Sequence, residues 1–101
     1  MTDAEVENRE NEAVLNAIQA LLGLISQDMR AVAVRVEGDR VDLSFWVRSH
    51  TDEIDEDIDQ AIFELDALYS EEHPLIESKV YEGWPDPTKL GVYGRMIYWA
   101  K

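Results

Sequence analysis

The residues best able to do chemistry lie together at positions 50 to 60, in the stretch HTDEIDEDIDQ. This stretch holds six carboxylates and no lysine or arginine. Carboxylates at this density could coordinate a metal ion, exchange protons in catalysis, attract a basic partner, or form the solvated face of a helix. The chain then adds four more acids as far as Glu72, again with no lysine or arginine. The segment from Asp52 to Glu72 therefore carries acidic charge without local compensation.

A calcium site is the first interpretation to test, because Asp55, Asp57 and Asp59 occupy positions 1, 3 and 5 of an EF-hand loop count. Position 6 of such a loop turns sharply and is glycine, whereas this chain has Gln60 there, and position 12 is Asp66 rather than the usual glutamate. The same residues also follow an unbroken helical pattern of apolar positions. We therefore expect no metal site, and no other motif indicates a cofactor.

An active site finds little support in the same segment. A catalytic pair of carboxylates needs two environments that separate its pKa values, and a run of solvent-facing acids provides none. His50 and His73 lie at opposite ends of the second predicted helix, too far apart to share a ligand, because a helix rises ~1.5 Å per residue. The chain has no cysteine and no glycine-rich phosphate loop. The sequence therefore predicts a protein that is not an enzyme and has no catalytic residues.

Two interpretations of the acids remain: a solvated helix face, or an electrostatic binding face. Acids spaced three and four residues apart on a helix repel one another, and a solvated face normally mixes both signs. An acidic patch raises the rate of association with a cationic partner. We therefore predict that the acids at the start of this helix bind a partner, namely Asp52, Glu53, Asp55, Glu56 and Asp59.

Aromatic residues outside the predicted core could supply affinity, because tryptophan and tyrosine dominate binding hot spots. Trp84 lies in the loop sequence GWPDP, Trp46 lies on the polar face of a predicted hairpin, and Tyr93 lies in the last predicted strand. We expect these three residues to contact the partner. The alternative is that Trp46 and Trp99 pair across the outer face of the sheet and only cover hydrophobic surface, and both interpretations stay open.

The elements that must position these residues follow from periodicity. Thr2 and Glu5 fit a capping box, and apolar residues at helical spacing predict a helix that ends near Gln27. Residues 31–48 alternate apolar and polar residues around the turn sequence EGDR and predict a hairpin. Helical spacing returns from Thr51, a plausible N-cap, until Pro74 ends it. Residues 75–82 and 91–100 predict two more strands, joined by the loop GWPDPTKL.

The order is therefore helix, hairpin, helix, hairpin (αββαββ), which predicts an α+β fold. We expect a four-stranded, mainly antiparallel sheet with both helices packed on one face, because the valine-rich side of the first hairpin must be covered. One core should then collect the apolar faces of both helices and of that hairpin, including Val34, Val36, Leu43, Phe45 and Ile62.

Length and charge limit the function further. The 101 residues suit a single domain, residues 1–101, and the net charge is −13. Such a charge repels nucleic-acid phosphates and anionic membranes, and it attracts cationic proteins. The charged N-terminus has no apolar core of a signal peptide, and no apolar run approaches a membrane span. We therefore expect a cytoplasmic protein that binds neither nucleic acid nor membrane.

A short, cysteine-free, strongly acidic α+β chain with an acidic helix and exposed aromatics resembles the immunity proteins of bacterial toxin systems, both contact-dependent and colicin-like. The resemblance lies in overall character rather than in a motif, and it assigns a role to no residue. It implies a cytoplasmic inhibitor that binds a cognate toxin domain, often a basic nuclease, and blocks its active site or a neighbouring surface.

The sequence as a whole therefore favours a small acidic protein that neutralises a cationic protein partner, with a bacterial toxin nuclease as the leading candidate. Three alternatives stay open at this point. They are a dimeric secretion chaperone, a DNA-mimic inhibitor of a nucleic-acid-binding protein, and a housekeeping domain whose acidity serves only solubility. A homodimer is compatible with each of these functions.

Overall fold

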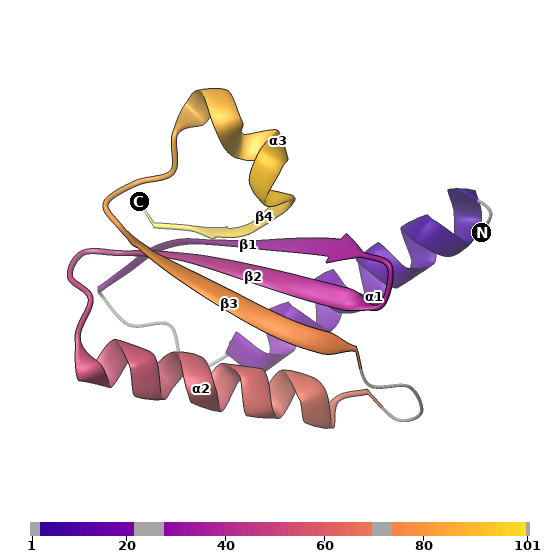
Figure 1. Ribbon diagram of the computed structural model, residues 1–101, viewed down its shortest axis with the longest axis horizontal. Coiled ribbons are helices and arrows are strands. Elements are labelled where there is room, and N and C mark those ends of the chain that lie inside the picture. The colour runs from indigo at the N-terminus through magenta and orange to yellow at the C-terminus, as the bar shows by residue number, and fades with distance from the viewer. Residues whose placement is uncertain (1–2, 22–27, 70–73, 101) are drawn as a thin grey trace.

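The computed structural model describes residues 3–21, 28–69 and 74–100. Helices and strands are interspersed along the chain (Figure 1). In order they are α1 (Asp3–Leu21), β1 (Met29–Glu37), β2 (Arg40–Val47), α2 (Asp52–Ala67), β3 (Leu75–Glu82), the 3-10 turn η1 (Pro87–Lys89), α3 (Leu90–Tyr93) and β4 (Arg95–Trp99).

The four strands form one sheet in the order β3-β2-β1-β4. β1 runs antiparallel to both β2 and β4, whereas β2 and β3 are parallel. The predicted α+β class and the mainly antiparallel sheet are confirmed. The parallel pair follows from α2, because two adjacent parallel strands need a crossover connection between them, and α2 provides it.

The prediction that the last two strands pair as a hairpin is wrong. β3 and β4 lie at opposite edges of the sheet, because α2 places β3 beside β2 and residues 83–94 then carry the chain to the free side of β1. The last strand also begins later than expected, at Arg95, since residues 90–93 form α3. Gly94 allows the chain to turn from α3 into β4. Its φ is 98°, a value that favours glycine, and a Cβ there would overlap the Val34 carbonyl oxygen.

The core lies between the sheet and the two long helices. The predicted alternation of the first hairpin is confirmed, since Val32, Val34, Val41, Leu43, Phe45 and Val47 are all buried on this inner face. α1 contributes small residues, Ala13, Ala17 and Ala20, so that its backbone can approach the strands closely. α2 contributes Ile54, Ile58, Ala61 and Leu65.

Three expectations about the core need adjustment. Val36 and Ile62 pack against the core but are only partly buried, and Ile18, which shares the apolar spacing of α1, is 42% exposed.

The predicted capping residue Thr2 and the predicted end of the first helix near Gln27 lie outside the described residues.

Burial therefore predicts different costs for two substitutions in the same cluster. Leu43→Ala should lower the free energy of unfolding by ~2–5 kcal/mol, because the side chain is 2% exposed and its removal leaves a cavity. Ile62→Ala should cost less, because part of that side chain already faces water. Urea unfolding followed by circular dichroism measures both values. A larger loss for Ile62→Ala would contradict this placement of the core.

Candidate partner-binding surface

The acidic helix α2 starts at the predicted residue. Thr51 adopts extended backbone angles (φ −121°, ψ 166°), and its Oγ1 accepts a hydrogen bond from the Ile54 N–H at 3.2 Å. Asp52, Glu53 and Asp55 occupy the first turn, where carboxylates interact favourably with the positive end of the helix dipole. The cap and the dipole therefore stabilise the end of the helix where like charges are most crowded.

The acidic side chains of α2 face solvent, because its apolar residues hold the opposite side against the sheet. All five predicted partner-binding acids are exposed: Asp52, Glu53, Asp55, Glu56 and Asp59. We call these five acids and the aromatic ring among them, described below, the acidic face. Its placement agrees with the sequence interpretation, and its role in binding stays a prediction.

One basic group touches the acidic face at its beginning. His50 Nε2 lies 2.6 Å from Asp55 Oδ1, and both side chains are exposed. The hydrogen bond to Asp55 raises the pKa of His50 above its ordinary 6.5, and the charges of Asp55, Glu82 and Asp52 raise it further, whereas desolvation lowers it. Protonated His50 therefore offsets part of the local negative charge.

Phe63 is a feature that the sequence interpretation missed. It lies on α2 with 74% of its surface exposed. Asp59 precedes it by four residues and Asp66 follows it by three, so both are its neighbours on the helix surface. The signal was available in the sequence, because Phe63 falls outside the apolar stripe of Ile54, Ile58, Ala61 and Leu65. The acidic face therefore contains a large exposed aromatic ring.

Trp84 is exposed, as predicted, and it belongs to a small cluster. Its ring lies 5.5 Å from the ring of Trp99, and the guanidinium carbon of Arg30 lies 5.1 Å from its centroid. The two indoles are 48% and 47% exposed. The alternative pairing of Trp99 with Trp46 is wrong, since Trp99 packs on Trp84. We call Arg30, Trp84 and Trp99 the tryptophan cluster.

The expected exposure of Trp46 is wrong. Its side chain is 2% exposed, because the β1 residues beside it, Ala31 and Ala33, are small and leave room for the indole. It stacks on Tyr81 at 5.4 Å and meets the edge of Tyr93 at 4.7 Å. Trp46 therefore packs inside the outer layer and offers no free surface to a partner.

Tyr93 also differs from expectation, because it belongs to α3 rather than to the last strand. Its ring contacts both Trp46 and Tyr81, so that it is only partly exposed. These aromatic contacts hold α3 against the face of the sheet that α1 and α2 leave open.

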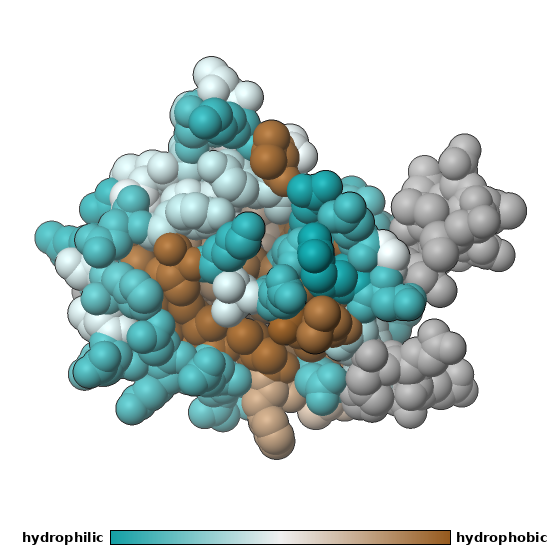
Figure 2. Space-filling view, viewed as in Figure 1, coloured by the Kyte–Doolittle hydropathy of each residue, from teal (hydrophilic) through white to brown (hydrophobic). Residues whose placement is uncertain are grey.

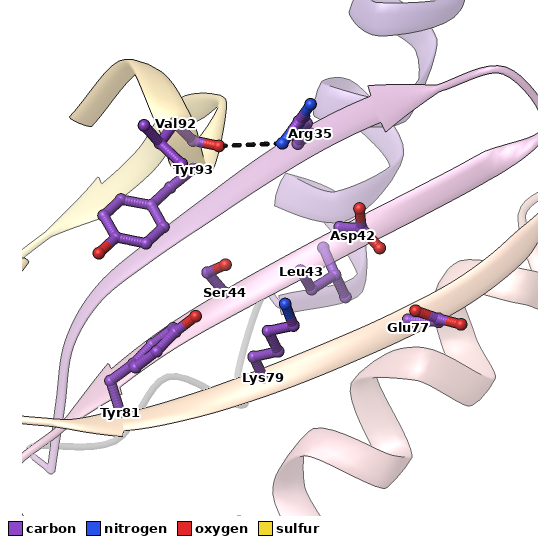
Figure 3. A pocket seen from close by; sticks show the side chains of 9 residues that line it. All are labelled: Arg35, Asp42, Leu43, Ser44, Glu77, Lys79, Tyr81, Val92 and Tyr93. Atoms are coloured by element: carbon purple, nitrogen blue, oxygen red, sulfur yellow. Dashed lines mark hydrogen bonds between the residues drawn. The ribbon is translucent and has the colours of Figure 1, made fainter. Parts of the chain in front are cut away.

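A hollow lies on the same outer face. Figure 2 shows polar and hydrophobic side chains mixed over the strands on this side. Figure 3 shows the hollow between β2, β3 and α3, with charged groups of both signs around it: Arg35, Asp42, Glu77 and Lys79. Its volume is about 110 Å³, whereas pockets for small molecules and cofactors usually hold ~300–1,000 Å³. The hollow is therefore too small to indicate a cofactor site.

Most of the features described above lie at one end of the sheet. The Gly83 N–H donates to the Val47 carbonyl at 2.8 Å, and the Ala100 N–H donates to the Arg30 carbonyl at 2.7 Å. These bonds place the ends of β2, β3 and β4 and the start of β1 together (Figure 1). The tryptophan cluster, His50 and the start of α2 therefore lie at the same end of the molecule.

Within the described ranges the structure has neither a metal-binding cluster nor a helix suited to span a membrane. No group of three or more histidine, aspartate or glutamate side chains there could hold a metal ion. No helix among those residues is long and apolar enough to cross a membrane.

Comparison with known protein families identifies the family of this chain. The family model described as MafI2 immunity protein matches residues 10–101, which include most of α1 and every later element. The chain therefore belongs to the MafI2 immunity protein family, and the resemblance to bacterial toxin-immunity proteins is confirmed. No curated protein sequence matches the chain.

The contact between His50 and Asp55 predicts a titration that can be measured directly. The pKa of His50 should lie above 6.5, and Asp55→Asn should lower it. A raised pKa in the folded state means that protonated His50 stabilises the fold fully below pH 6.5 and that this stabilisation is lost as pH rises through the folded pKa. Proton NMR of the imidazole measures both values. An identical pKa in the two proteins would contradict the contact.

Proposed function

We propose that this immunity protein neutralises a toxin domain with a basic surface, and that the acidic face of α2 docks on that surface. The observation that carries the proposal is an exposed aromatic ring, Phe63, among exposed carboxylates on one helix. A nuclease is the toxin class that this surface suits best, because nucleases bind polyanions through basic sites. Carboxylates at such a site would compete with the phosphates of the substrate.

Charge and aromatic rings should contribute differently to this complex. Charges attract before contact, over about a Debye length of ~8 Å at physiological salt, and they raise the association rate more than the final affinity. An aromatic side chain acts only when a pocket on the partner surrounds it, and it then slows dissociation. The acids of α2 should therefore set the rate of encounter.

The tryptophan cluster extends the proposed surface beyond the helix. Trp84 and Trp99 are about half exposed, and the contacts of the Trp84 ring with Arg30 and Trp99 favour an ordered ring. An ordered ring loses less entropy on binding than a free one. We therefore include Trp84 as an anchor beside Phe63, and we leave Trp46 out because it is buried.

The first functional prediction concerns association. Neutralising Asp55, Glu56 and Asp59 together, as Asp55→Asn, Glu56→Gln and Asp59→Asn, should slow association with the toxin domain and flatten its salt dependence. The matched control removes three acids outside α2, as Glu10→Gln, Glu12→Gln and Glu37→Gln. Stopped-flow mixing at two salt concentrations, with the product of the gene directly upstream as the candidate toxin, measures both rates. Equal rates for test and control would mean that only net charge matters.

The second functional prediction concerns dissociation. Trp84→Ala and Phe63→Ala should each speed dissociation and weaken binding by about 2 kcal/mol or more, which is roughly 30-fold in Kd. Leu15→Ala is the control, because Leu15 is 66% exposed but lies on α1. Surface plasmon resonance measures the dissociation rates. If all three variants dissociate like the original protein, these rings are not anchors.

A further inference from the structure

The outer edge of β3 is an unusual sheet edge. In the described part of the chain β3 pairs with β2 alone, over eight residues and without any register shift. The opposite edge strand, β4, has five residues and an irregular register with β1. Edge strands present unpaired N–H and C=O groups, and natural proteins prevent pairing by shortening, bulging, covering or charging such strands. β4 is short and irregular, whereas β3 is long and regular and carries only charges of both signs, Glu77 and Lys79, in its middle.

The hydrogen bonds of β3 show which groups face this edge. The N–H of Leu75 donates to the Asp39 carbonyl at 2.9 Å, and the N–H of Gly83 donates to the Val47 carbonyl at 2.8 Å. Both bonds point toward β2. Because successive residues of a strand alternate in direction, Ile76, Ser78 and Val80 direct their N–H and C=O groups away from β2. These three residues can bond another strand.

We propose that a second copy of this chain pairs here, β3 against β3, antiparallel and with the twofold axis at Ser78. Ser78 then faces Ser78 of the second copy, and Ile76 faces Val80. The two residues of each pair exchange two N–H···O=C bonds, as the hydrogen-bonded pairs of an antiparallel ladder do. Glu77 faces Lys79 between these pairs, and Leu75 faces Tyr81 beyond them. Twofold symmetry makes each of these contacts occur twice.

Charge selects this register among the neighbouring ones. In an antiparallel pairing, residues whose N–H and C=O groups point away from β2 must lie opposite each other. The twofold axis therefore passes through a residue and not between two residues, and the neighbouring registers have their axes at residues 77, 78 and 79. An axis at 77 would put Glu77 opposite Glu77, and an axis at 79 would put Lys79 opposite Lys79. Like charges directly opposite are destabilising, and opposite charges are stabilising. The axis at Ser78 is the register that pairs each glutamate with a lysine.

Apolar surface supports the same pairing. Leu75 is 61% exposed, and in the pair it would cover Tyr81 of the second copy. Ile76 and Val80 are partly buried against the core, and the pairing would continue that core across the axis. Figure 2, drawn from the same side as Figure 1, shows hydrophobic side chains along the diagonal that β3 follows.

The net charge of −13 per chain opposes this association, so the test is made at physiological salt, where charges beyond ~8 Å are largely screened. Sedimentation equilibrium across the micromolar range should show a monomer–dimer equilibrium for the original protein. E77K alone and K79E alone should each weaken it about tenfold or more, because each substitution turns both attractive pairs into repulsive ones. The double variant E77K/K79E should restore the dimer.

The decisive measurement is an equimolar mixture of the E77K chain with the K79E chain. In the mixed dimer every introduced charge faces a residue of opposite sign, so the mixture should dimerise more strongly than either variant alone. Circular dichroism and urea unfolding check that both variants are folded, and no toxin is needed. A monomeric original protein at all concentrations, or a mixture no more dimeric than its components, would overturn the proposal. A monomer in which E77K lowers affinity for the toxin would also overturn it, since the edge would then take a strand of the partner.

Discussion

The burial of one apolar stripe of α2 against the sheet is the interaction on which the remaining features depend. It outweighs the repulsion among the acids on the exposed side of the helix. Each of Ile54, Ile58 and Leu65 contributes ~1.5–3 kcal/mol when fully buried, whereas like charges one helical turn apart cost only ~0.2–0.5 kcal/mol per pair. The first two turns contain six such pairs: Asp52–Asp55, Asp52–Glu56, Glu53–Glu56, Glu53–Asp57, Asp55–Asp59 and Glu56–Asp59. The same burial turns the acids outward and makes α2 the crossover that sets β3 parallel to β2.

Much of this layer can be predicted from sequence, because it depends on local periodicity. The alternation from Val32 to Val47 identified the inner face of the first hairpin, and Thr51 identified the start of α2. The pairing of β3 and β4 could not be predicted in this way. The partner of each strand is fixed by contacts between segments far apart in the chain, which local periodicity does not record. A neighbouring strand in sequence need not be a neighbour in the sheet.

The outer layer shows a different limit. Arg35, Glu37 and Asp42 indicated a solvent face, and Trp46 on that face was therefore expected to be exposed. The residues that decide otherwise are Ala31 and Ala33 on the adjacent strand, which leave space for the indole under Tyr81 and Tyr93. Two small residues on one strand beside a large one on the next are a signal that can be found in sequence, but only once the register of the hairpin is known.

The two surfaces that we propose, the acidic face of α2 and the edge of β3, differ in how their charges are arranged. α2 has no lysine or arginine, whereas the strands carry Arg30, Arg35, Arg40, Lys79 and Arg95 among their acids. The unbalanced charge of α2 has no complement on another copy of α2, so the docking that we propose for this helix calls for a partner of opposite charge. On β3 the signs alternate within one strand, and that pattern is its own complement under a twofold axis. Net charge alone would predict only repulsion between two copies. A single glutamate and a single lysine on the regular edge of β3 favour pairing instead, because each faces its opposite across the proposed axis.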